Sequence, residues 1–334
     1  LTYTWSAVTV PAGATPTFSI DGSNASKNTT VTFNKAGNYS FLVTISDGTL
    51  TTTSSVSLTV SPTLSSIAVT PGNFSLNFNG SRALTATASD QFGTALTVQP
   101  AFTWNNTGVG TLSASGIYSA GTAAGTGSIT ASAGGVSGSA TATVTNAPPT
   151  VAIASSAGAS TVTGTSTTLS VLGADDAGEN ALTYTWSTIS APGGANPTFS
   201  INGTNTAKLT TVTFNKAGSY SFRVTISDGT LTTSSSVTLN VAQTLTGVAV
   251  TPGSISLSLN GTRTFTAAAS DQFGAALTVQ PAFTWSNTGK GSITTAGLYS
   301  AGAVAGTATI IASAGGVSGN ASVTVSNTAP TVAT

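Results

Sequence analysis

The chain of 334 residues contains no cysteine, no histidine and no methionine. Without thiols it cannot form disulfides, so its stability must come from packing, and this absence by itself assigns no compartment. The same absences exclude a Ser-His-Asp triad, a cysteine nucleophile and a metal site made of His or Cys within these residues. We therefore expect a protein that is not an enzyme.

Charge is also scarce, since 5% of the residues are charged where an ordinary soluble domain has about 25%. Eight Lys and Arg are scattered against eight Asp and Glu, so no basic stripe is available for phosphates and we expect no nucleic-acid partner. Apolar residues are interleaved with Thr, Ser and Gly, and no run approaches the ~18 residues of a spanning helix. We expect no membrane insertion and no signal peptide in this sequence. Net charge near zero suits a protein that associates with copies of itself or with neighbouring repeats.

A tandem repeat organises the sequence. The string LTYTWS at residues 1–6 recurs at 182–187, and the same offset of 181 places Trp104 on Trp285 without a gap. Repeats of this kind indicate an array of similar folded units.

The residues within each repeat favour strands. Leu1, Tyr3 and Trp5 alternate with hydroxyl residues, which is the period of a strand with one apolar face. The pair Asp47-Gly48 lies between two such runs and predicts a hairpin with a type I′ turn, in which both turn residues have positive φ. Short strands then follow at intervals of roughly ten residues with Gly, Pro, Asn or Asp between them. No segment shows a helical period.

The pattern predicts an all-β protein of tandem immunoglobulin-like β-sandwich domains of two alternating types. The predicted boundaries are a partial first-type sandwich at 1–61, a second-type sandwich at 62–146, a complete first-type sandwich at 147–242, a second-type sandwich at 243–327 and the first strand of a further domain at 328–334. Within the first type, Lys-Ala-Gly precedes Tyr39 and, in the second copy, Tyr220. This spacing predicts a tyrosine corner, in which the hydroxyl bonds back to the main chain.

These motifs carry a family resemblance. The units with LTYTWS, TVTFNKAG and the TISDG turn resemble the PKD/cadherin-like repeats of large bacterial surface proteins. Those with IAVTP, SDQFG, PAFTW and GIYSAGTAAG resemble bacterial immunoglobulin-like group 2 domains, as found in intimin- and invasin-type adhesins. The resemblance implies extracellular stalks, adhesins, surface layers or fibres.

Three acidic residues in one loop, Asp175, Asp176 and Glu179, are the candidate metal site. Ca²⁺ takes six to eight oxygen ligands, and these carboxylates could supply several of them. The alternative is a solvated loop without a metal. The aspartates elsewhere, Asp47, Asp228, Asp90 and Asp271, are expected to stabilise turns.

Two further residue classes allow a functional and a structural interpretation. Trp5, Trp186, Trp104 and Trp285 could form a sugar-binding platform, but one tryptophan per sandwich at a fixed position favours a core anchor. Lys35 and Lys216 could form crosslinks to the adjacent Asn34 and Asn215. Because neighbouring strand residues point to opposite faces, we expect solvated lysines instead.

The predicted function is a structural repeat segment of an extracellular bacterial rod, filament or surface layer on the cell surface. The alternative is the stalk of an adhesin whose binding tip, with any host-surface ligand, lies outside this sequence. The unit at 1–61 has no counterpart of residues 150–171, so we expect an unpaired sheet edge there. Residues 328–334 of a neighbouring copy could fill that edge by strand addition, unless a longer polypeptide supplies the strands itself.

Overall fold

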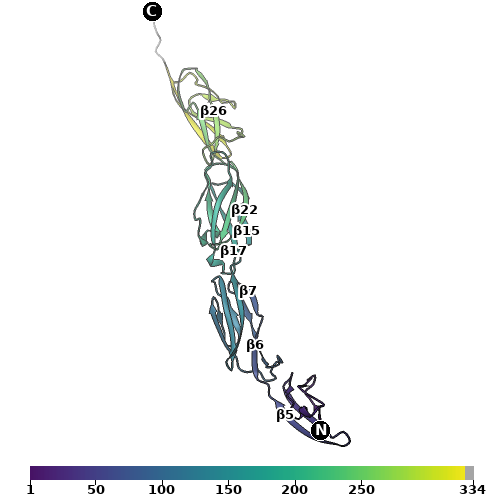
Figure 1. Ribbon diagram of the computed structural model, residues 1–334. Helices are drawn as coiled ribbons and strands as arrows, with labels where there is room; N and C mark the ends of the chain where they lie inside the picture. Colours follow the sequence, from purple (N-terminus) through teal and green to yellow (C-terminus); the bar gives the residue numbers. More distant parts are fainter. Residues whose placement is uncertain (328–334) are drawn as a thin grey trace, which may run out of the picture. The chain divides into compact units, whose positions relative to one another are not determined.

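The computed structural model describes residues 1–327 as β-strands joined by loops and three 3-10 turns (Figure 1). The chain divides into two compact units, Leu1–Ala147 (unit 1) and Pro148–Thr334 (unit 2). Each unit contains one first-type and one second-type sandwich. The prediction of an all-β chain of tandem β-sandwiches is confirmed, whereas the strand predicted at 328–334 lies outside the described residues.

The first-type sandwich of unit 1 has a three-stranded sheet in the order β1-β4-β5 and a two-stranded sheet, β2-β3. Its elements are β1 (Thr2–Thr9), β2 (Thr17–Phe18), η1 (Asn24–Asn28), β3 (Val31–Thr32), β4 (Gly37–Ser46) and β5 (Thr51–Val60).

The second-type sandwich of unit 1 contains sheets in the orders β10-β13-β14-β7, β11-β12-β8 and β6-β9. Strand β7 joins β14 in parallel, and the other pairs are antiparallel. The strands are β6 (Leu64–Thr70), β7 (Asn73–Asn77), β8 (Ser81–Ala83), β9 (Thr85–Asp90), β10 (Thr103–Gly108), β11 (Thr111–Leu112), β12 (Ile117–Ser119), β13 (Gly125–Ala133) and β14 (Val136–Thr145).

The first-type sandwich of unit 2 has two four-stranded sheets, β15-β17-β20-β19 and β16-β22-β21-β18. The 181-residue offset places the counterparts of β15, β16 and β17 before residue 1. The elements are β15 (Thr150–Ala157), β16 (Thr161–Val162), β17 (Ser166–Ala174), η2 (Glu179–Ala181), β18 (Thr183–Ser190), β19 (Thr198–Phe199), η3 (Asn205–Lys208), β20 (Leu209–Thr213), β21 (Gly218–Ser227) and β22 (Thr232–Val241).

The second-type sandwich of unit 2 repeats its counterpart in unit 1, with the orders β24-β31-β30-β27, β25-β29-β28 and β23-β26. Its strands are β23 (Leu245–Thr251), β24 (Ser254–Ser258), β25 (Thr262–Thr264), β26 (Thr266–Asp271), β27 (Thr284–Gly289), β28 (Ser292–Ile293), β29 (Leu298–Ser300), β30 (Gly306–Ala314) and β31 (Val317–Ser326). None of the helical turns in the described residues is long and apolar enough to span a membrane.

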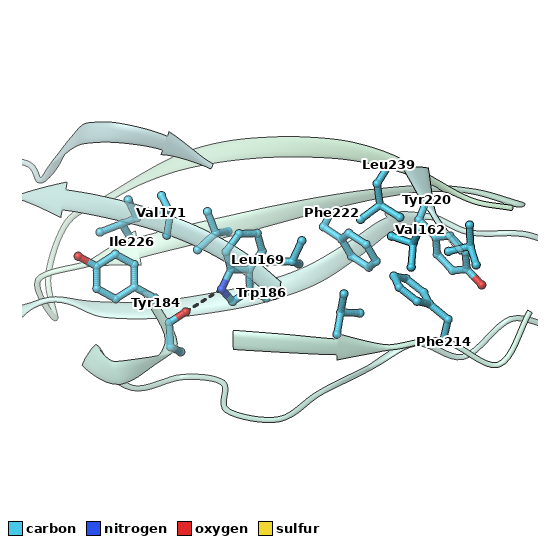
Figure 2. Packing of buried hydrophobic residues seen from close by; sticks show 14 of the residues in the cluster. Val162, Leu169, Val171, Tyr184, Trp186, Phe214, Tyr220, Phe222, Ile226 and Leu239 are labelled. Atoms are coloured by element: carbon cyan, nitrogen blue, oxygen red, sulfur yellow. Dashed lines mark hydrogen bonds between the residues drawn. The ribbon is translucent and has the colours of Figure 1, made fainter. Parts of the chain in front are cut away.

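The alternation in β21 builds the core of the complete first-type sandwich. Tyr220, Phe222, Val224 and Ile226 are buried, while the residues between them face outward. Figure 2 shows Trp186 in the middle of this cluster, where its indole N–H donates to the carbonyl of Ala207 at 2.8 Å. The aromatic and aliphatic side chains of β21, together with Trp186 of β18, therefore supply much of the buried surface that a chain without disulfides needs.

Both predicted tyrosine corners form. The hydroxyl of Tyr39 donates to the carbonyl of Lys35 at 2.8 Å, and that of Tyr220 donates to the carbonyl of Lys216 at 2.7 Å. Both rings are almost completely buried. Burial of the hydroxyl raises the pKa of Tyr220, and the bond to the main chain satisfies that hydroxyl inside the sandwich.

The predicted hairpin between β4 and β5 forms, but the predicted turn type is wrong. Gly48 has a φ of +104°, whereas Asp47 does not adopt positive φ. The last strand pair is Ser46 with Thr51, so the loop has four residues. The carboxylate of Asp47 accepts hydrogen bonds from the N–H groups of Leu50 and Thr49, and these bonds lower its pKa to about 2. Side-chain bonding of this kind stabilises a longer loop that the Asp-Gly pair alone does not reveal.

Glycine is required beside the tryptophan of each second-type sandwich. Gly116 has a φ of +82°, and a Cβ atom there would lie 2.9 Å from the carbonyl oxygen of Leu84 and 3.0 Å from the Trp104 ring. Gly297 repeats the arrangement against Phe265 and Trp285. The recurring Gly at the start of the GIYS and GLYS segments therefore makes room for the tryptophan ring.

Removing one corner hydroxyl should weaken its sandwich. In Tyr220→Phe the ring and its packing remain, but the bond to the carbonyl of Lys216 is lost, so we expect about 1 kcal/mol less stability in chemical unfolding. Tyr39→Phe should cost a similar amount in unit 1. A Tyr220→Phe variant with unchanged stability would contradict the role given to the corner.

Candidate functional site

The acidic loop at 175–179 lies between β17 and β18 of unit 2, and Glu179 within it forms a hydrogen-bonded network. Its carboxylate accepts from the Lys208 ammonium at 2.9 and 3.0 Å, from the Tyr184 hydroxyl at 2.9 Å and from the Asn205 amide at 3.1 Å. The Tyr184 hydroxyl in turn accepts from the N–H of Gly173 at 3.0 Å. Glu179 therefore ties together η2, η3 and the start of β18.

Electrostatics favour the ionised form of Glu179. The hydrogen bond from Lys208 is the main cause that lowers the pKa of this carboxyl below its ordinary value of 4.5, and the bonds from Tyr184 and Asn205 act in the same direction. Partial desolvation opposes them. The Lys208 and Glu179 side chains are 34% and 27% exposed, so solvent screening keeps the contribution of the pair modest.

The lysine of this network is also present in the first copy of the first-type sandwich. In unit 1, η1 carries Lys27, whose ammonium donates to the amide oxygen of Asn24 at 3.4 Å. The 181-residue offset places the counterpart of Glu179 before residue 1. The network could not be predicted from the sequence because Glu179 and Lys208 are 29 residues apart and meet only in the folded sandwich.

Asp175 lies at the start of the same loop but does not join Glu179. One carboxylate oxygen, Oδ2, accepts from the N–H of Ala177 at 2.9 Å, while Oδ1 is buried without a hydrogen-bond partner. Asp176 follows it in the chain. In the described part of the chain, no three His, Cys, Asp or Glu side chains gather into a group that could hold a metal ion. Glu179 is held by Lys208, so the calcium prediction depends on Asp175 and Asp176 and stays a prediction.

The tryptophans lie against the cores of their sandwiches. Trp186 is 2% exposed and belongs to the buried cluster of unit 2, in agreement with the core interpretation for this residue. Trp104 and Trp285 are partly buried against the cores of the second-type sandwiches. Trp5 packs against its core and donates to the carbonyl of Ser26 at 2.9 Å, as Trp186 does to Ala207.

The two lysines beside the tyrosine corners make contacts that the prediction of solvated side chains omitted. Lys35 donates to the carbonyl of Ala12 at 2.8 Å, and Lys216 donates to the carbonyl of Gly193 at 2.6 Å. The adjacent Asn34 accepts instead from the N–H of Thr15 at 2.9 Å. The lysine of each Lys-Ala-Gly turn therefore contacts a neighbouring loop by donating a hydrogen bond to a main-chain carbonyl.

The aspartates of the SDQFG turns fulfil the predicted role. Asp90 accepts from the N–H groups of Phe92 and Thr94, and Asp271 accepts from those of Phe273 and Ala275, all at 2.9 to 3.0 Å. Their near-complete burial was not predicted, since Asp90 is 5% and Asp271 2% exposed.

Apolar side chains of the first-type sandwich are less covered in unit 1 than in unit 2. Leu58 is 37% exposed, whereas its counterpart Leu239 is 5% exposed. In unit 2, Val162 of β16 and Leu169 of β17 join the cluster that buries Leu239. We call the surface formed by Trp5, Val31 and Leu58 the open face of unit 1.

Comparison with known protein families finds a match for one domain of the chain. Residues 157–241, which contain most of the complete first-type sandwich, match a family model that describes a PKD domain. No curated protein matches the sequence.

Solved structures with tandem domains align at low identity. Drosophila N-cadherin EC1-4 aligns over 98% of this chain and 92% of its own, with 12% identity and a TM-score of 0.39. Domains 1-6 of the surface layer protein SbsC align over 98% of this chain, with 16% identity and a TM-score of 0.26. The alignment covers 50% of that SbsC chain.

Acid should weaken the complete first-type sandwich. The folded-state pKa of Glu179 lies below its ordinary value, so its contribution is present at neutral pH and is lost as the pH falls below about 4.5 through the folded pKa. Glu179→Gln should remove that part of the pH dependence and cost about 0.2 to 1 kcal/mol at pH 7. Lys208→Met should cost a similar amount, and the double variant little more, in chemical unfolding from pH 3 to 7. Additive losses would show that the two residues act independently.

Calcium should act through Asp175 and Asp176 if the loop binds it. Millimolar Ca²⁺ is then expected to raise the melting temperature of the wild-type chain, and Asp175→Asn should abolish the increase. Calorimetry with Mg²⁺ as the control ion measures this effect. An unchanged melting temperature in Ca²⁺ would rule out the site.

Proposed function

We propose that this chain is a structural repeat segment of an extracellular bacterial rod, filament or surface layer. The observation that carries the proposal is that core contacts of one sandwich pair recur 181 residues later. Tyrosine corners, tryptophan anchors and SDQFG turns reappear with nearly the same distances. Duplication that preserves the framework of each sandwich is typical of proteins that use repeats for extension.

The second-type sandwiches support the finer assignment to bacterial immunoglobulin-like group 2 domains. Their GIYS and GLYS segments form short strands, β12 and β29, that pair with β8 and β25. The buried tyrosines of these strands, Tyr118 and Tyr299, donate to the carbonyls of Val109 and Lys290. The tyrosine of each motif thus has a structural role in the sandwich.

We also propose that strands equivalent to β15, β16 and β17, from the same polypeptide or from a neighbouring copy, pair with the open face of unit 1. In unit 2, β16 pairs in parallel with β22, and β17 pairs with β20. The corresponding edges of β5 and β3 have no such partners within the described residues of unit 1. Unpaired edges next to apolar side chains favour pairing with an added strand. The same strands supplied by one longer polypeptide would cover the same surface.

Self-association and peptide binding test these proposals together. We expect the chain to form ordered fibres or lattices in electron micrographs and to sediment as oligomers. A synthetic peptide of residues 148–174 should compete with this association and slow deuterium uptake in β5, because it supplies the strands that cover the face in unit 2. Uptake in β22 is the internal control and should not change.

Two outcomes would contradict the proposals. A chain that stays monomeric at all concentrations would exclude assembly through its own repeats and favour an adhesin stalk. Unchanged uptake in β5 with saturating peptide would exclude strand addition while leaving the structural role open to the assembly measurement.

A further inference from the structure

A glutamine in unit 2, Gln243, forms hydrogen bonds to residues that are also present in unit 1, where the glutamine itself is absent. Gln243 follows β22, and its side-chain nitrogen donates to Oδ2 of Asp271 at 3.0 Å and to the carbonyl of Ala276 at 3.2 Å. Its side-chain oxygen accepts from the N–H of Thr278 at 3.0 Å and from the Thr278 hydroxyl at 2.9 Å. A primary carboxamide has two N–H donors and two acceptor lone pairs. All four are therefore used.

The counterpart of Gln243 in unit 1 is Pro62, which has neither a side-chain polar group nor a backbone N–H. The three residues that bind Gln243 are unchanged, since Asp90, Ala95 and Thr97 stand in place of Asp271, Ala276 and Thr278. Within the described residues, Oδ2 of Asp90 and the carbonyl of Ala95 accept no hydrogen bond, and the N–H of Thr97 donates none. Two acceptors, Oδ2 of Asp90 and the carbonyl of Ala95, and two donors, the N–H and the hydroxyl of Thr97, are therefore available at this position.

The geometry of the loop is the same in both copies. The N–H of Asp90 donates to the carbonyl of Thr94 at 2.8 Å, as that of Asp271 does to Ala275. Gln99 braces the loop from behind through bonds to both main-chain groups of Ala88, at 2.6 and 3.1 Å, and Gln280 repeats these distances on Ala269. The groups in unit 1 are thus held in the arrangement that binds a carboxamide in unit 2.

A groove leads to these groups. It has a volume of ≈ 300 Å³, and its lining includes Asp90, Ala95, Thr97 and Pro62. Asp90 is 5% exposed, and the SDQFG turn uses only the other oxygen of its carboxylate. In unit 2 the matching hollow counts Gln243 among its lining residues, so there the amide forms part of the wall. Oδ2 of Asp90 has no hydrogen-bond donor among the described residues, so a donor that enters the groove can bind it.

We propose that the groove at Asp90, Ala95 and Thr97, which we call the amide groove, recognises the primary carboxamide of a glutamine or asparagine side chain from a partner polypeptide. The two N–H groups of the bound carboxamide donate to Oδ2 of Asp90 and to the carbonyl of Ala95, and its carbonyl oxygen accepts from the N–H of Thr97. A lysine or arginine would satisfy the two acceptors but leave the N–H of Thr97 without an acceptor. A secondary amide, as in an acetylated amino sugar, has one N–H for the two acceptors. The site does not depend on the structural role proposed above.

Nuclear magnetic resonance of the ¹⁵N-labelled whole chain tests the proposal with the tripeptides Gly-Gln-Gly and Gly-Glu-Gly. The glutamine peptide should shift the Thr97 amide resonance saturably, and the glutamate peptide should bind at least tenfold more weakly, because a carboxylate offers no donor and is repelled by Asp90. The Thr278 resonance should not move with either peptide, since Gln243 already occupies that position.

Two variants test the proposal by filling the amide groove of unit 1 or by removing the glutamine from the matching position of unit 2. Pro62→Gln should fill the amide groove from within, slow hydrogen exchange at the Thr97 amide and abolish its response to the peptide. Gln243→Ala should open the site of unit 2, so that the Thr278 amide exchanges faster and responds to Gly-Gln-Gly. This second variant tests the geometry independently if Pro62→Gln does not fold.

Three results would overturn the proposal. The first is that the Thr97 amide of the wild-type chain does not respond to the glutamine peptide, and the second is that it responds equally to the glutamine and glutamate peptides. The third is that it responds more strongly to N-acetylglucosamine than to Gly-Gln-Gly. The last result would assign the groove to an acetylated sugar instead of a polypeptide.

Discussion

The structure depends on burying aromatic side chains while satisfying their polar atoms. The chain has no disulfides and few charges, so each sandwich is stabilised by packing around its tyrosines, phenylalanines and tryptophan. The hydroxyls of Tyr39, Tyr118, Tyr220 and Tyr299 each donate to a main-chain carbonyl, and the indole N–H of Trp186 does the same. These bonds allow large polar aromatic residues to remain in the core at little cost.

Because the cores are preserved between copies, the differences between copies lie at edges and loops. Unit 2 places Gln243 where unit 1 has Pro62. In unit 1 the amide groove presents the groups that Gln243 binds in unit 2. The two copies can therefore be compared, and the amide contacts in unit 2 indicate which ligand the same groups can bind in unit 1.

The strands, the tandem sandwiches and the tyrosine corners could be predicted from the sequence, because alternation and the Lys-Ala-Gly-x-Tyr spacing are local. The turn at Asp47 was predicted with the wrong type, since its four-residue loop depends on side-chain bonds to Thr49 and Leu50. The Glu179 network and the Gln243 site could not be predicted, because their partners lie roughly thirty residues away and meet only in the folded sandwich. The PKD-like part of the family resemblance is supported at 157–241, and the calcium prediction awaits measurement.

Stretching single molecules of the whole chain tests most directly whether each complete sandwich is a self-sufficient structural element. We expect separate force peaks as successive complete sandwiches unfold, with about 300 Å of extended chain for each second-type sandwich of roughly 85 residues. Extension of the chain without force peaks would contradict this expectation, because sandwiches that open without resistance could not serve as segments of a rod or filament.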